Sequence, residues 1–232
     1  DLFDAEVIVP NQTSGVRTRA TRTALEEVLV RVAGQDAVLQ TAPAKQMLKK
    51  PDALVQQYRY FNEPDSEPPL LKLWVRFDGN AIRKSLQQQG QAYWGNERPD
   101  TLVWLAVEER GKRYVVSADV GTDVHQQIAL AAKQRGLPIV FPLMDLEDQS
   151  KVRFSDIWGG FFENVTAASR RYNPQAVLVG RLNRSSSGGW SSRWHLEVAG
   201  RPSAWSDSSQ QLNTLSQKGI DDTADLLASR FA

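Results

Sequence analysis

The chain has 232 residues, of which 41% are hydrophobic, and this is enough apolar material for one large or two small folded domains. Its 28 basic and 27 acidic side chains are evenly balanced in both halves. Neither half therefore carries the excess charge that would steer the protein to nucleic acid or anionic membranes. Cysteine is absent, which excludes disulfides, thiolate nucleophiles and cysteine-based zinc sites, and no apolar run approaches the roughly 20 residues that a membrane span needs.

The first half of the chain combines strand and helix patterns. Apolar residues at every second position predict a strand over residues 3–9, and apolar residues three or four apart predict a helix from Ser14 to a left-handed stop at Gly34. The arginines of this helix are expected mostly on its solvent side: Arg17, Arg19, Arg22 and Arg31. A short helix, two strands and a helix are predicted next, over residues 42–50, 54–61, 71–77 and 78–90. We therefore predict a β-α-(α)-β-β-α domain over residues 1–97 and a linker over 94–99.

The second half contains two nearly continuous apolar segments, residues 101–107 and 176–182, a pattern typical of strands covered by helices on both faces. Other patterns predict a hairpin strand over 113–117, a helix over 123–136 and a short Pro-containing strand over 137–143. A helix starting at Ser155 is predicted over 155–172, followed later by a strand over 203–208 and a terminal helix over 212–231. We predict a second α/β domain over residues 98–232, with a mixed sheet flanked by helices. The fold class is thus α/β (mixed α+β), with two small domains.

The stretch SDIWGGFF, residues 155–162, resembles either a ligand-cradling glycine loop or a helix beginning packed closely against a neighbour. Its glycines do not follow a buried strand and lack the spacing of nucleotide-binding loops. A helical stripe continues across them: Ile157, Phe161, Val165, Ala168 and Tyr172. We favour packing, with Gly159 and Gly160 leaving bare backbone for close approach of a Trp ring, a strand or a partner, and we place Trp158 with them in a candidate binding surface.

An acidic stretch follows the predicted strand over 137–143. Asp145, Glu147 and Asp148 could bind a hard cation such as Mg²⁺, because ligands gather beyond the carboxyl ends of strands in open α/β sheets. The alternative is a solvated acidic turn before a helix. We favour the turn and expect no cofactor.

Few residues suggest catalysis. The only histidines are His125 and His195, and neither G-x-S-x-G nor H-E-x-x-H occurs. His195 is expected to point away from the Trp190 and Trp194 face of its strand, so that a structural or surface role is favoured for it. The sequence therefore predicts a protein that is not an enzyme.

Tryptophan and arginine residues are interleaved in the last third of the chain. Trp190 and Trp194 share one strand face, and Trp205 and Arg181 lie nearby. Such groups can bind a partner by stacking. Strand tryptophans also pack beneath helices, and we favour the core while keeping Trp190, Trp194 and Arg181 as candidate partner-binding residues.

Several stretches together resemble the bacterial domain-of-unknown-function family 2066 over nearly the whole chain: ALEEVLVRVAG, VQQYRY, LWVRFD, TLVWLAVE, RGLPIVFPLMDLED, SDIWGGF, VLVGRL and GWSSRWHL. The second half, through residues 177–181, more weakly resembles the anticodon-binding-like α/β domain of periplasmic assembly proteins. These resemblances imply export, with removal of a signal peptide, and imply no reaction.

Two functions of different class follow. The first is a non-enzymatic periplasmic module that binds a protein or an envelope polymer, without nucleic acid and without a transmembrane segment. The alternative is a small-molecule or metal-dependent enzyme that uses the acidic stretch. A strand beginning almost at Asp1 fits a cleaved signal peptide, and it fits a trimmed chain equally well.

Overall fold

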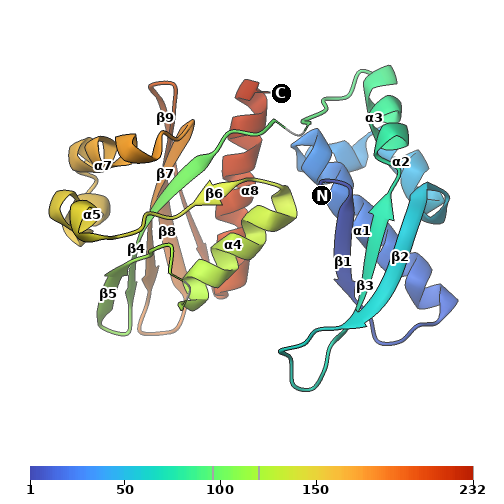
Figure 1. The fold of residues 1–232 in the computed structure, drawn as a ribbon, viewed down its shortest axis with the longest axis horizontal. Helices are drawn as coiled ribbons and strands as arrows, with labels where there is room; N and C mark the ends of the chain where they lie inside the picture. The colour runs from blue at the N-terminus through green and yellow to red at the C-terminus, as the bar shows by residue number, and fades with distance from the viewer. Residues whose placement is uncertain (96, 120, 232) are drawn as a thin grey trace. The chain divides into compact units, whose positions relative to one another are not determined.

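The computed structural model describes residues 1–95, 97–119 and 121–231. Its fold is mixed α/β, with two sheets of three and six strands (Figure 1). The chain divides into two compact units, unit 1 (Asp1–Glu97 with Ala228–Ala232) and unit 2 (Arg98–Leu227). Of the linker predicted over 94–99, Trp94 is buried in unit 1, and Asn96 lies outside the described residues.

Unit 1 is a three-stranded antiparallel sheet with helices. The sheet order is β1-β3-β2, and the strands are β1 (Asp4–Ile8), β2 (Val55–Asn62) and β3 (Leu71–Phe77). The helices are α1 (Ser14–Ala33), α2 (Ala42–Lys49) and α3 (Gly79–Gln88), with the 3-10 turns η1 (Asp36–Gln40) and η2 (Pro51–Leu54). Every second residue of β3, Leu73, Val75 and Phe77, is buried in one apolar core with the inner face of α1. The predicted order of elements in this half is therefore confirmed.

The prediction for Arg31 was wrong. Arg31 is 4% exposed, and its guanidinium donates hydrogen bonds to the carbonyl oxygens of Leu2 (2.9 Å) and Asp4 (2.7 Å) and to the carboxylate of Glu27 (2.8 Å). Burial lowers the pKa of the Arg31 guanidinium, while Glu27 and Asp4 oppose that shift. The side chain is buried because it satisfies carbonyl groups at the start of β1, a contact between segments far apart in the sequence.

Unit 2 is built on a mixed sheet of order β5-β4-β7-β8-β9, with β6 beside β4. The strands are β4 (Thr101–Glu109), β5 (Lys112–Val115), β6 (Ile139–Val140), β7 (Ala176–Arg184), β8 (Trp190–Val198) and β9 (Arg201–Ser209). β4 runs parallel to β6 and β7, and the other pairs are antiparallel. β6 is shorter than the predicted strand over 137–143 because Pro138 and Pro142 have no N–H to donate to a ladder.

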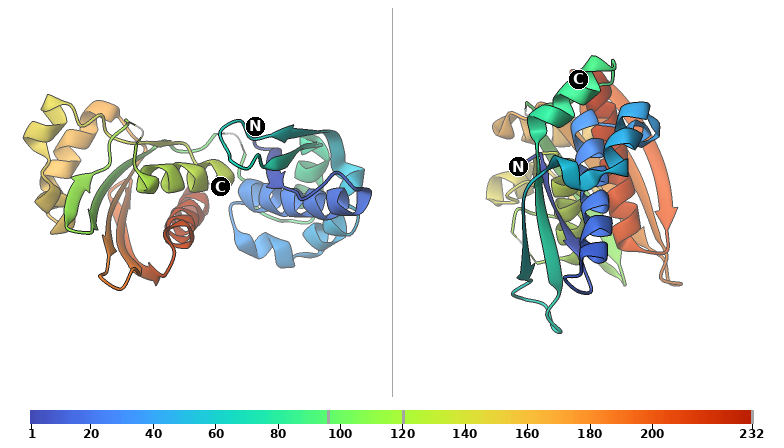
Figure 2. Two further views of the ribbon diagram at one scale, coloured as in Figure 1. Left: turned by 90° about the horizontal axis from the view of Figure 1, so that it is seen from below. Right: turned by 90° about the vertical axis from the view of Figure 1, so that its right-hand side faces the viewer.

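Helices cover the two faces of this sheet. They are α4 (Asp123–Arg135), α5 (Leu146–Lys151), α6 (Phe154–Trp158), α7 (Phe162–Ser169) and α8 (Leu212–Phe231), with the 3-10 turn η3 (Arg170–Tyr172). Figure 2 shows α4 and α8 on one face and α5 and α7 on the other. On this second face, α6 and α7 contribute Ile157 and Val165 to a core that they share with Trp104 of β4 and Val179 of β7. The same face of β8 and β9 is more open, since Arg193, Ala204 and Ser206 are exposed.

Candidate partner-binding groove and acidic cluster

A groove with a volume of about 210 Å³ lies where α6 and the start of α7 meet β7, β8 and β9. It brings together residues from four of these elements: Trp158, Gly159, Phe162, Arg181, Arg193 and His195. Gly160 and Trp194 also border it. The candidate binding residues of α6 and β7 predicted from the sequence are thus neighbours, and Trp190 is not among the residues that line the groove.

The two glycines end one helix and position the next, which corrects the predicted uninterrupted helix. α6 ends at Trp158, Gly160 has a φ of 77°, and α7 begins at Phe162. A Cβ on Gly159 would come within 2.5 Å of the Phe161 ring and 2.9 Å of the Ser155 carbonyl oxygen. Close approach is therefore required at Gly159, and a left-handed backbone is required at Gly160. Phe161, predicted on the buried stripe, is 68% exposed because the break turns it outward.

Trp158 borders the groove, and its ring contacts the side chains of Arg181 and Phe154. The Arg181 guanidinium donates a 2.7 Å hydrogen bond to the Trp158 carbonyl oxygen, and its central carbon lies 5.3 Å from the Trp158 ring centroid. The Phe154 ring also stacks on Trp158 with centroids 5.2 Å apart, and the Arg113 guanidinium lies 5.8 Å from the Phe154 ring. These contacts fix Trp158 and Arg181 before any partner arrives.

The Trp194 ring lies on the opposite face of the sheet. Trp194 is 0% exposed, and its ring lies against Gly180 of β7 and Gly219 of α8. Its indole N–H donates to the Ser192 hydroxyl at 3.1 Å. Trp190 is 7% exposed and lies under the Arg184 guanidinium, 5.8 Å from it. Both rings are therefore buried inside unit 2.

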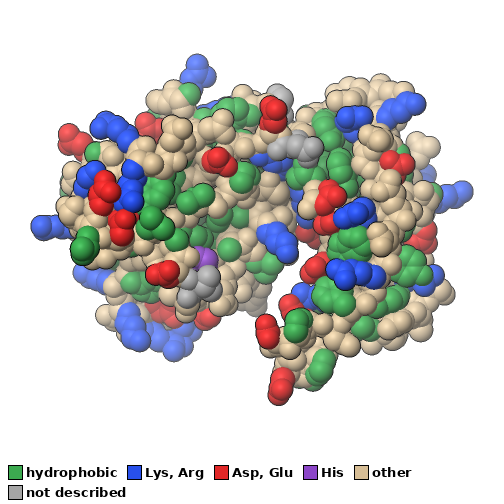
Figure 3. Space-filling model, viewed as in Figure 1, with side chains coloured by type: hydrophobic (Ala, Val, Ile, Leu, Met, Phe, Trp, Pro, Cys, Tyr) green, Lys and Arg blue, Asp and Glu red, His purple; other side chains and the backbone are tan. Residues whose placement is uncertain are grey.

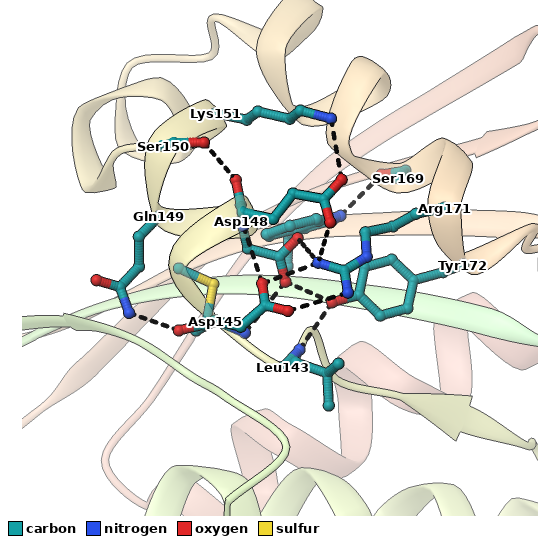
Figure 4. Close-up of polar contacts among 12 residues, drawn as sticks. Leu143, Asp145, Asp148, Gln149, Ser150, Lys151, Ser169, Arg171 and Tyr172 are labelled. Atoms are coloured by element: carbon teal, nitrogen blue, oxygen red, sulfur yellow. Dashed lines mark hydrogen bonds and ion pairs between the residues drawn. The ribbon is translucent and has the colours of Figure 1, made fainter.

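The acidic residues converge on one arginine (Figure 4). The Arg171 Nη1 atom lies 2.8 Å from a carboxylate oxygen of Asp145, 3.2 Å from one of Glu147 and 3.3 Å from one of Asp148. Hydrogen bonds from Arg171 lower the pKa of the Asp145 carboxyl. Among the described residues, no group of three or more His, Cys, Asp or Glu side chains is arranged to hold a metal ion. The three carboxylates thus share the positive charge of Arg171, and Glu147 also pairs with Lys151 at 3.4 Å.

Asp148 anchors the segment before α5. Asp148 is fully buried, accepts a hydrogen bond from the Met144 N–H (3.1 Å) and accepts another from the Tyr172 hydroxyl. The same hydroxyl accepts the Leu143 N–H at 2.9 Å. Burial, together with the bond to Asp148, raises the pKa of Tyr172 to about 12. These contacts connect residues 143–148 to η3. On the surface, acidic and basic side chains are interspersed over the region of α5 and α7 (Figure 3).

The histidines contact aromatic rings. His125 is 9% exposed and lies 4.4 Å from the Phe141 ring, and His195 lies 4.6 Å from the Phe162 ring, by centroids. Within the residues that the structure describes, neither imidazole is hydrogen-bonded to a carboxylate or a serine. These positions give no Ser-His-Asp arrangement.

Arg193 and Phe162 line the groove but were not among the candidate binding residues chosen from the sequence. Strand alternation puts Arg193 on the face of β8 opposite Trp190 and Trp194, but only the strand register shows that it lies beside Arg181. Phe162 follows a turn that was predicted to be continuous helix.

Comparison with known proteins identifies one region. Residues 1–95 match a domain of unknown function, DUF8605. This finding corrects the expected resemblance, because the domain is not family 2066, and no likeness to an anticodon-binding-like domain is found. No curated protein matches the chain. A solved structure, described only as that of an uncharacterized protein, is 12% identical, covers 59% of this chain and 100% of its own, and has a TM-score of 0.20.

Neither description names a reaction, a substrate or a partner. In the described part of the chain, no helix is both long enough and apolar enough to span a membrane. Residues 1–95 thus carry an uncharacterised domain, and the groove lies in unit 2, beyond the matched region.

Proposed function

We propose that this protein is a non-enzymatic binding or assembly module of the bacterial periplasm, and that it binds a protein or an envelope polymer at the groove formed by α6, α7, β7, β8 and β9. The groove supports this proposal because an ordered aromatic ring and arginines border it. Trp and Arg are enriched among the residues that dominate binding energy at protein interfaces. The observation that carries the proposal is the fixed Trp158–Arg181 contact at the edge of an open sheet face.

The enzyme alternative has less support. Its carboxylates, Asp145, Glu147 and Asp148, are all within ion-pair distance of Arg171. A cation would have to displace this guanidinium, and Asp148 would lose a buried set of hydrogen bonds. In the favoured function the groove binds the partner, and the acidic cluster has a structural role.

The periplasmic location was expected from a resemblance that the family match over residues 1–95 does not support, so it is the part of the proposal that needs a direct test. A chain without cysteine is compatible with an oxidising compartment. Cell fractionation of a native host tests the location: the protein is expected with periplasmic markers, and recovery with cytoplasmic markers contradicts it.

The groove itself can be tested by photo-crosslinking in the native host. A photoreactive amino acid at Ala204, an exposed residue that lines the groove, is expected to give a discrete crosslinked product. The matched control is Gln126, which is exposed on α4 at the opposite face of the same sheet. Equal labelling from both positions, or none from Ala204, contradicts a binding role for the groove.

A further inference from the structure

Arg181 and Arg193 face each other without a counter-charge. They are direct partners in the antiparallel register of β7 and β8, and both line the groove. Directly opposed residues project from one face of a sheet with Cβ atoms about 4.5–5.5 Å apart, and like charges in this relation destabilise the sheet. Across residues 1–95, 97–119 and 121–231, neither guanidinium forms an ion pair with Asp or Glu.

One of the two arginines is held in place. The hydrogen bond to the Trp158 carbonyl and the contact with its ring orient Arg181, while Arg193 is exposed. A guanidinium carries five N–H donors, and the bond to Trp158 uses one of them. Several donors of this pair are thus available at the groove, in a geometry suited to the two oxygens of a carboxylate.

We infer that the groove binds an acidic segment of a partner protein, with a carboxylate of that segment placed between Arg181 and Arg193. This inference rests on the proposed function and names the chemistry of its partner. The ligand supplies the negative charge that relieves the repulsion between the two cations. The rings of Trp158 and Phe162 border the same groove and give the segment an apolar surface beside its carboxylate.

The surroundings favour an acidic peptide over a polyanionic polymer. Outside the pair, the same face of β8 and β9 carries Ser191, His195, Glu197, Ala204 and Ser206, with no further Lys or Arg and thus no continuous basic surface. A polyanion is bound through many phosphate contacts along a basic stripe. A groove of about 210 Å³ with two arginines instead suits one or two carboxylates.

Selection from a random linear peptide library displayed on phage tests the inference with the whole chain as bait. Wild-type protein is compared with Arg193→Gln and with Arg170→Gln, which removes an exposed arginine on η3 outside the groove. Selected peptides are expected to be enriched in Asp or Glu at a fixed position. Their affinity is expected to fall roughly tenfold in Arg193→Gln, as for loss of a charge-assisted hydrogen bond, and to stay unchanged in Arg170→Gln.

The outcomes separate the inference from the proposed function. Peptides without acidic enrichment that still crosslink from position 204 overturn the inference and leave the groove as a binding site. Selected peptides that fail to crosslink from position 204 and bind Arg193→Gln as well as wild type overturn both. A library that yields no binder, or polyphosphate that binds more tightly than every selected acidic peptide, also overturns the inference.

Discussion

The indole of Trp194 lies directly against Gly219: a Cβ added to this glycine would come within 2.6 Å of the ring. The ring also lies directly against Gly180, where an added Cβ would come within 2.5 Å of it. The glycines of β7 and α8 therefore make the space that the fully buried Trp194 ring of β8 occupies. A helix interior otherwise favours Ala over Gly by about 1 kcal/mol.

Gly219→Ala is expected to destabilise unit 2 by about 1–3 kcal/mol, because overpacking of a closed core outweighs the gain in helix propensity. Urea unfolding followed by tryptophan fluorescence measures the change. Gly15→Ala in α1 is the matched control, since its Cβ would meet only the Arg19 side chain at 3.7 Å. The control is expected to be neutral or stabilising, and equal free energies of unfolding for Gly219→Ala and wild type would contradict the packing.

Gly160→Ala tests the backbone between α6 and α7. Its φ of 77° costs a residue with a Cβ about 1–2 kcal/mol, and no atom lies within 4 Å of the added Cβ. A loss of about 1 kcal/mol in the free energy of unfolding is therefore expected from conformation alone. Gly160→Asn is expected to lose less, because Asn tolerates left-handed backbone better than Ala. Similar losses for the two variants would point to a cause other than backbone conformation.

Tyr172→Phe tests the bond to buried Asp148. Removing the hydroxyl leaves the carboxylate and the Leu143 N–H each without one partner, so a loss of about 1–3 kcal/mol is expected near pH 7. Unfolding in urea measures it. Phe161→Leu, an exposed aromatic substitution nearby, is expected to change stability little.

The pH dependence of stability gives a second test of Tyr172. Its pKa is raised from 10.0 to about 12, so the unfolded chain loses the phenol proton first as the pH rises. This group's contribution to stability is fully present below pH 10 and is lost between pH 10 and about 12. Unfolding free energies across this range are expected to fall more steeply for wild type than for Tyr172→Phe. Identical slopes would show that the hydroxyl is not titrating in this way.

Much of the fold follows from periodicity. The apolar runs of β4 and β7 predict strands that are covered on both faces. Gly34, with a φ of 77°, ends α1 at the position where a left-handed glycine was predicted. Each of these signals is local. The tryptophan face of β8 is equally visible, because a strand buries alternate residues.

Contacts between residues far apart in the sequence could not be predicted from local patterns. Arg31 appears solvent-facing until the carbonyl groups of β1 are brought beside it. The stripe across Gly159 and Gly160 keeps helical spacing by coincidence, and spacing alone cannot reveal a left-handed φ. The Arg181–Arg193 pair depends on the register of β7 and β8, which is set by the turn between them.

The opposed arginines should weaken the free protein slightly. Arg193→Gln removes one of two like charges and no contact that braces the fold, so it is expected to leave the free energy of unfolding unchanged or to raise it by up to about 1 kcal/mol. Arg170→Gln is the control for removal of an exposed arginine elsewhere.

The most direct test is the yield of the crosslinked product from position 204 in Arg193→Gln cells, measured beside the unfolding free energy of the same variant. We predict a stable protein whose yield falls well below that of wild type and of Arg170→Gln. An unchanged yield would contradict the account, because Arg193 would then not contact the partner, and a yield that falls only together with the unfolding free energy would contradict it too, because Arg193 would then support the fold.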